Sequence, residues 1–143
     1  MTGTLDLDVT VNEMTSIAGG AERKIRVLLA DDHAVLRAGM TSLLNDEPDI
    51  EVVGEACDGQ MAVELALDLQ PDVILMDVTM PRLNGIEATR RIIARLPYAR
   101  IIGLSMHEQE SMGAAMRNAG AKAYLTKDGR CETLMEAIRA QRE

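Results

Sequence analysis

The sequence predicts an α/β fold with a doubly wound parallel sheet, and two alternating patterns along its 143 residues support this prediction. Short continuous apolar runs are typical of strands that are covered on both faces. The longer segments between them repeat apolar residues every three, four or seven positions, which marks one face of a helix. Five strand–helix units in succession favour a single sheet with right-handed crossovers and helices on both faces.

The predicted strands are the apolar runs, and the predicted helices lie between them. The strands cover residues 25–30, 52–53, 73–76, 101–104 and 123–125. Apolar residues at helical spacing mark the five helices: Leu36, Met40, Leu43 and Leu44; Met61, Leu65 and Leu69; Ile86, Ile93 and Leu96; Met112, Met116 and Ala119; and Leu134 and Ile138. Asn84, followed three residues later by Glu87, resembles a capping box and predicts the start of the third helix.

The first 24 residues have a different pattern. Four apolar residues alternate there with polar ones at the period of a strand, before a glycine pair ends the pattern: Leu5, Leu7, Val9 and Val11. A strand in this segment has no partner within the segment itself. We therefore predict residues 1–24 as an N-terminal tail or linker and residues 25–143 as the folded domain.

The composition excludes several classes of partner. The formal net charge is −8, with 23 acidic against 15 basic residues, so the chain repels phosphate backbones and anionic lipid surfaces. We expect no direct nucleic-acid binding and no membrane binding by this chain. Tyr98 and Tyr124 are the only aromatic residues, so stacking platforms for single-stranded nucleic acids are missing as well.

The cysteines and histidines predict neither a disulfide framework nor a zinc site. Cys57 and Cys131 are isolated, which favours a reducing compartment, and we expect Cys57 to be buried at the end of the second strand. His33 and His107 share no ligand spacing with the cysteines. No apolar run approaches the ~20 residues of a membrane span, and no secretory signal is expected. The prediction is a cytoplasmic protein.

Polar residues follow the apolar runs at one edge of the predicted sheet. Asp31 and Asp32 follow the first run, Asp77 the third, Ser105 the fourth and Lys127 the fifth. In an open parallel sheet, ligands bind beyond the carboxyl ends of the strands. Three crowded carboxylates repel one another unless a cation lies between them, and Mg²⁺ suits oxygen ligands of this kind.

A carboxylate, a divalent cation, an ammonium and a hydroxyl together suit phosphoryl transfer. The cations neutralise charge on the transferred group while the carboxylate attacks in line. Neither GxxxxGK[ST] nor GxGxxG occurs, so the phosphoryl group is expected from a donor other than a nucleotide held by such a loop. Each residue alone has a simpler explanation: Asp31 could cap a helix, and Lys127 could be an exposed loop residue. The prediction of a phosphoryl-transfer site depends on the presence of all of them at one edge of the sheet.

These motifs together resemble bacterial response-regulator receiver domains over residues 25–142. Within that family they are most similar to receivers with LuxR-type helix-turn-helix effectors, or to receivers of hybrid histidine kinases. The resemblance implies a flavodoxin-like fold with strand order 2-1-3-4-5 and five helices. It rests on four segments: Leu29-Ala30-Asp31-Asp32-His33; Asp77-Val78-Thr79-Met80-Pro81-Arg82-Leu83-Asn84-Gly85; Leu104-Ser105; and Tyr124-Leu125-Thr126-Lys127.

The resemblance implies a magnesium site beside a phosphorylated aspartate. Asp77 would be the residue that is phosphorylated. Asp32 would bind Mg²⁺ directly and Asp31 directly or through water. Asp77 itself and the backbone carbonyl of Thr79 would complete the protein ligands.

The remaining motif residues would act on the phosphoryl group and on the conformational response. Lys127 would pair with the phosphoryl oxygens, and Ser105, which stands where Thr is common, would donate its hydroxyl to one of them. Tyr124 would be the rotating aromatic side chain that reports phosphorylation to an output surface. The implied partner is a sensor histidine kinase or a phosphotransfer protein, while self-association as a homodimer is left open.

The function predicted from this resemblance is a phosphoacceptor signalling domain that catalyses only its own phosphorylation and dephosphorylation. One alternative is a phosphate-independent interaction domain of receiver type. A second is an aspartate-nucleophile phosphatase, which needs a further acid two residues after the nucleophile, where this chain has Thr79. The segment Gly3-Thr4-Leu5 also resembles the final strand of a kinase ATP-binding domain, as a hybrid kinase would have.

Overall fold

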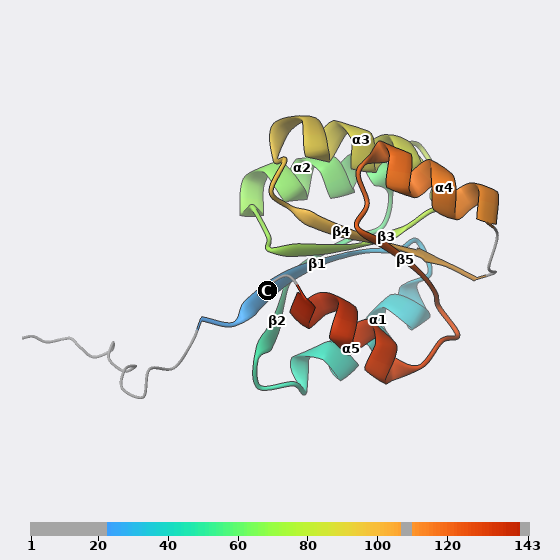
Figure 1. Cartoon of the computed structure of the whole chain (residues 1–143). Coiled ribbons are helices and arrows are strands. Elements are labelled where there is room, and N and C mark those ends of the chain that lie inside the picture. Colours follow the sequence, from blue (N-terminus) through green and yellow to red (C-terminus); the bar gives the residue numbers. More distant parts are fainter. Residues whose placement is uncertain (1–22, 107–109, 141–143) are drawn as a thin grey trace, which may run out of the picture.

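The computed structural model describes residues 23–106 and 110–140 and confirms the predicted α/β fold (Figure 1). The alternating apolar segment before residue 23 and the histidine at position 107 lie outside the described residues, so the boundary at residue 24 stays a prediction. One parallel sheet of five strands has the order β2-β1-β3-β4-β5. Its strands are β1 (Ile25–Ala30), β2 (Ile50–Ala56), β3 (Val73–Asp77), β4 (Arg100–Ser105) and β5 (Ala123–Thr126).

Five helices cover the two faces of the sheet in the described part of the chain. One face is covered by α2, α3 and α4, and the other by α1 and α5 (Figure 1). Each face has its own apolar core, as expected for a sheet buried on both sides. The helices are α1 (Ala34–Asn45), α2 (Gly59–Leu69), α3 (Gly85–Arg95), α4 (Glu110–Ala119) and α5 (Cys131–Arg139).

The central strand β3 is fully buried, whereas the edge strand β2 is not. Every residue of β3 is buried, which explains the uninterrupted apolar sequence of its first four residues, before Asp77 ends the strand. In β2, Glu51 and Glu55 are exposed and interrupt the apolar sequence on either side of residues 52–53. Because these two glutamates shorten the apolar run, only residues 52–53 were predicted as a strand, and β2 is longer than that. Cys57 was expected to be buried and is exposed, because it lies one residue beyond the end of β2.

Side-chain caps and one close approach place α2 and α3 against the carboxyl edge of the sheet. Asp58 accepts a hydrogen bond from the Met61 amide at the start of α2, at 2.8 Å. Asn84 accepts one from the Glu87 amide at 2.9 Å, so the predicted cap of α3 is confirmed. A side chain at Gly85 would collide with the carbonyl oxygen of Asp77, so only glycine lets α3 begin this close to β3.

Among the described residues, no helix is both long enough and apolar enough to cross a membrane.

Candidate functional site

The carboxyl edge of the sheet brings the predicted site residues together. Asp31 directly follows β1, Asp77 ends β3, Ser105 ends β4 and Lys127 directly follows β5. Neighbouring strands align these ends: Asp77 pairs with Leu104, and Ser105 pairs with Thr126. The Lys127 amide donates to the Ser105 carbonyl at 2.7 Å and extends this alignment past the end of β5. Residues far apart in the sequence therefore meet because parallel strands end at a common edge.

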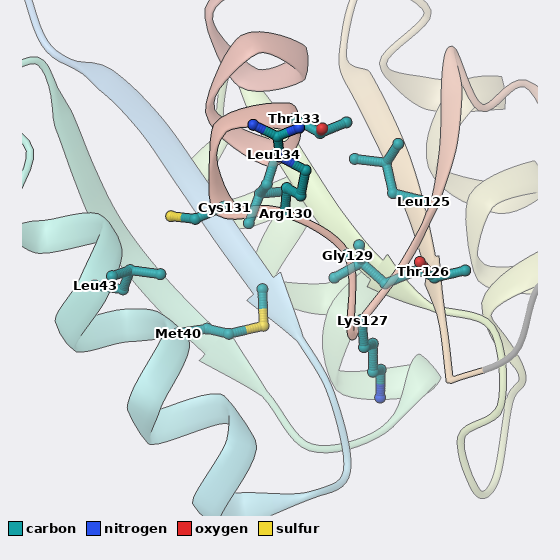
Figure 2. Close-up of a pocket in the computed structure, with 11 residues that line it drawn as sticks. Met40, Leu43, Leu125, Thr126, Lys127, Gly129, Arg130, Cys131, Thr133 and Leu134 are labelled. Atoms are coloured by element: carbon teal, nitrogen blue, oxygen red, sulfur yellow. The ribbon is translucent and has the colours of Figure 1, made fainter.

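An ion-pair triad occupies the centre of this edge. The Lys127 ammonium lies 2.9 Å from Asp31 Oδ2 and 3.0 Å from Asp77 Oδ2. All three side chains are almost completely buried, with exposed fractions of 2%, 0% and 4% for Lys127, Asp31 and Asp77. The Lys127 side chain extends away from Arg130 and Cys131 at the start of α5 (Figure 2). One ammonium thus serves two buried carboxylates.

This imbalance of charge appears in the pKa values of the three groups. Burial raises the pKa of Asp77 to about 6 from an ordinary 3.8, although hydrogen bonding and attraction to Lys127 oppose the rise. Burial also acts to raise the pKa of Asp31, but bonds from Lys127 and from the His33 amide outweigh it and hold that pKa below its ordinary value. Burial disfavours the charged form of Lys127, yet the two carboxylates hold its pKa above the ordinary value. The site favours an additional cation.

The second oxygen of each buried carboxylate is fixed by the local backbone. Asp31 Oδ1 accepts a hydrogen bond from the His33 amide at 2.8 Å. Asp77 Oδ1 accepts one from the Thr79 amide at 3.2 Å. In both turns, an Asp side chain accepts a hydrogen bond from the backbone amide two residues later. Such a turn is by itself a sufficient structural reason for a single Asp at the end of a strand. Here the same turns orient two carboxylates toward one ammonium.

Four side chains at this edge have the spacing of a metal site. Ligand atoms of Asp31, Asp32, His33 and Asp77 all lie within 4.8 Å of one another. Asp32 is partly exposed, so it presents a carboxylate to solvent above the buried pair. Carboxylate oxygens and excess negative charge suit a hard divalent cation, so the residues present fit Mg²⁺.

His33 is the member of this cluster that was not among the predicted Mg²⁺ ligands and for which a zinc site was not expected. Its Nδ1 lies 3.1 Å from Asp31 Oδ1 and 3.3 Å from Asp32 Oδ1. A ligand spacing shared with cysteine does not reveal this cluster, since no cysteine belongs to it. The relevant signal was the direct adjacency of His33 to the two acids.

Tyr124 lies between two glycines on the face covered by α4. A Cβ atom at Gly103 of β4 or at Gly113 of α4 would each lie 3.0 Å from the ring. The Tyr124 hydroxyl is buried and has no hydrogen-bond partner within the described ranges. A buried hydroxyl without a partner is costly, so this position of the ring leaves a polar group unsatisfied.

The pocket next to the triad is mainly aliphatic and lies between α1 and α5. Met40 and Leu43 of α1 face Leu134 of α5 across it, in a volume of about 380 Å³ (Figure 2). Lys127 contributes to its wall, but neither Asp31 nor Asp77 does. The pocket therefore meets the triad only through Lys127 and does not include its carboxylates.

Comparison with known proteins identifies the family. Residues 27–139 match the response regulator receiver domain family, and the chain belongs to it. It is therefore a receiver domain of the kind found in two-component systems.

The curated relatives include whole transcriptional regulators. The chain is 43% identical to the transcriptional regulatory protein DegU of Brevibacillus brevis over 118 residues, which cover 82% of this chain and 50% of DegU. It is 46% identical to the transcriptional regulatory protein LiaR of Bacillus subtilis over 116 residues, covering 81% of this chain and 55% of LiaR. The chain thus spans about half the length of these relatives.

Solved structures agree with the fold. A LuxR-family two-component response regulator from Aurantimonas has a TM-score of 0.78 and 38% identity, covering 82% of this chain and 84% of that chain. The response regulator domain of Thermotoga maritima CheB has a TM-score of 0.76 and 38% identity, and the match covers 83% of this chain and 96% of that domain's chain. The predicted similarity to receivers of the LuxR type is confirmed.

Proposed function

We propose that this receiver domain is a phosphoacceptor in which Asp77 accepts a phosphoryl group in a Mg²⁺-dependent reaction. The observation that carries the proposal is the buried triad, in which one ammonium faces two carboxylates at the carboxyl edge of the sheet. Such a site has negative charge to share with a metal and a cation ready for an incoming phosphoryl group. The donor would be a phosphohistidine of a sensor histidine kinase or of a phosphotransfer protein.

The metal would be held by Asp31, Asp32, Asp77 and the backbone carbonyl of Thr79. When bound, it would neutralise charge on the transferred phosphoryl group. The Asp77 carboxylate would attack phosphorus in line, forming a P–O bond as the bond from phosphorus to the donor breaks. The electron pair of that broken bond leaves with the donor group.

Lys127 and Ser105 would act on the product. The phosphoryl oxygens would replace the Asp77 carboxylate as a partner of the Lys127 ammonium, which lies only 3.0 Å from Asp77 Oδ2. Ser105 lies at the end of the adjacent strand β4, from which its hydroxyl would donate to one phosphoryl oxygen. These contacts bias a loop between two conformations.

Tyr124 would transmit that change to the surface formed by α4, β5 and α5. Its unsatisfied buried hydroxyl favours movement of the ring once Ser105 binds the phosphoryl group. The domain would catalyse only its own phosphorylation and dephosphorylation. Its output would be control of an effector or partner, while nucleic-acid contact by this acidic chain is not expected.

Intact mass measured after incubation with Mg²⁺ and acetyl phosphate tests the proposal. One phosphoryl group is expected on the unmodified protein, and none on Asp77→Asn or after chelation of the metal. Asp72→Asn is the matched control, because Asp72 immediately precedes the same strand at its other end. Absence of phosphorylation in the unmodified protein would contradict the proposal and favour the phosphate-independent interaction domain.

A further inference from the structure

Arg37 contacts the main chain of the acidic site from α1. Its Nη1 donates to the carbonyl oxygen of Asp31 at 2.5 Å. Its Nε donates to Glu55 Oε1 on β2 at 3.0 Å. The side chain is largely buried, with an exposed fraction of 19%. One guanidinium therefore joins the site loop after β1 to the neighbouring edge strand.

The carbonyl that Arg37 contacts belongs to the peptide that links Asp31 to Asp32. On the other side of Asp31, its amide donates to the Ala56 carbonyl at 2.9 Å. Asp31 is thus held by its amide to β2 and by its carbonyl to Arg37. Because this peptide group is planar, fixing its orientation also fixes the direction in which the chain leaves toward Asp32. The relative placement of the two carboxylates depends on that direction.

The charge and shape of arginine suit this position. The guanidinium is planar and rigid, so it can bond a carbonyl and a carboxylate at the same time, whereas a lysine ammonium is a single point of charge. Glu55 accepts from its Nε and so fixes the orientation of the guanidinium. A charged donor also makes a stronger bond to a carbonyl than a neutral one.

We propose that Arg37 is a positioning residue that sets the affinity of this site for a divalent cation, by holding the peptide between Asp31 and Asp32. The inference builds on the proposed phosphoacceptor function. Arg37 itself touches neither the metal nor the phosphoryl group. Partners that orient the groups around a metal typically change its affinity by about 10–100-fold when they are removed.

Arg26 offers a matched control near the amino end of β1, away from the carboxyl edge of the sheet. Its Nη1 donates to the carbonyls of Leu69 and Gln70, at 2.9 and 3.0 Å. Arg26→Met therefore removes an arginine that braces backbone carbonyls, as Arg37→Met does, but at the edge away from the acidic site. Both variants are expected to unfold at a lower urea concentration.

Isothermal titration with Mg²⁺ separates the two variants. Arg37→Met should raise the Mg²⁺ dissociation constant by about tenfold, while Arg26→Met leaves it unchanged. Phosphorylation by acetyl phosphate should need more Mg²⁺ in Arg37→Met, and saturating Mg²⁺ should restore most of the rate. The Mg²⁺ dissociation constant of Arg37→Lys should lie between those of the unmodified protein and Arg37→Met, because lysine keeps the charge but not the planar guanidinium.

Equal Mg²⁺ affinity in Arg37→Met and the unmodified protein would overturn the inference and leave the proposed function intact. If the unmodified protein binds no Mg²⁺, the proposed function fails instead. Should Arg37→Met not fold, Glu55→Ala and Glu55→Gln provide the test. Gln keeps an acceptor for Arg37 and should preserve the Mg²⁺ affinity, whereas Ala releases the guanidinium and should weaken it. Equal affinities in these two variants would also overturn the inference.

Discussion

The two ends of β3 carry an aspartate each, and the two aspartates differ in what surrounds them. Asp72, just before the strand, accepts hydrogen bonds from the Arg23 guanidinium and from the Arg26 amide, both at 2.9 Å. Asp77, at the last residue, shares one lysine with Asp31. Asp72 connects the start of β3 to β1, and the Arg23 guanidinium balances its charge. Asp77 lies where negative charge exceeds positive.

This difference separates a structural ion pair from a site prepared for a ligand. A matched pair gains little from a further cation, and partial exposure of Asp72 moderates its interactions. Two buried carboxylates on one ammonium remain electrostatically incomplete until a cation binds or a proton is taken up. The same residue type at the two ends of one strand therefore serves different purposes, and substitutions at Lys127 and Asp77 test that contrast.

The largest effect is expected from Lys127→Met, which leaves two buried carboxylates without their cation. Removal of one partner from a buried ion pair typically costs about 3–5 kcal/mol of unfolding free energy at neutral pH. Urea unfolding followed by far-ultraviolet circular dichroism measures this loss. Mg²⁺, or acidification to protonate a carboxylate, should recover part of it. Arg23→Met, which removes the cation beside Asp72, should cost below about 1 kcal/mol; equal losses at the two ends would refute the contrast.

An intermediate effect with a defined pH dependence is expected from Asp77→Asn. Because the folded-state pKa of Asp77 is raised from 3.8 to about 6, its ionisation removes stability as pH rises through that window. Without divalent cations, the Asn variant should match the unmodified protein below about pH 4 and exceed it by about 2–3 kcal/mol at pH 7. Urea titrations at both pH values measure the difference.

The control for this pH series is again the other end of the strand. Asp72→Asn should be less stable than the unmodified protein, because it weakens a charge-assisted bond from Arg23. Saturating Mg²⁺ should erase the advantage of Asp77→Asn, since the metal stabilises the ionised form. If Asp77→Asn has the same stability profile as the unmodified protein, the Asp77 carboxylate is not under electrostatic strain.

The smallest effect is expected from Tyr124→Phe, which removes a hydroxyl instead of a charge. The Tyr124 hydroxyl is buried without a hydrogen-bond partner in the described ranges, so its loss should raise stability by about 1 kcal/mol. Tyr98→Phe is the comparison, because Tyr98 is 72% exposed and its loss of a hydroxyl should leave stability almost unchanged. Thermal unfolding of both variants decides the point; a Tyr124→Phe protein that melts earlier would mean that the hydroxyl is bonded.

Local pattern alone predicted the order of strands and helices and the edge at which the polar residues gather. The central strands were clear because burial on both faces requires uninterrupted apolar sequence, as in β3. The edge strand β2 was seen only in part, since Glu51 and Glu55 face solvent there. Cys57 was assigned to the core for the same reason: the position at which an edge strand ends is not visible in its apolar pattern.

The candidate site was predicted as a set of residues, but not as a geometry. Strand order and the common carboxyl edge are enough to place Asp31, Asp77, Ser105 and Lys127 near one another. The degree of burial of the triad, and hence the raised pKa of Asp77, follows from side-chain packing around the loops. The approach of His33 to Asp31 and Asp32 could not be predicted, because it depends on the orientation of the imidazole ring.

The sequence by itself determined the α/β class, the succession of strands and helices along the chain and the identity of the residues at the acidic edge, because these follow from apolar periodicity and from which residues end each strand. Only the tertiary structure decided that one buried lysine serves two buried carboxylates. It alone decided that Arg37 and Glu55 brace the peptide between the acids. Such contacts join residues from separate elements, and their distances depend on how helices pack on the sheet, which no local pattern encodes.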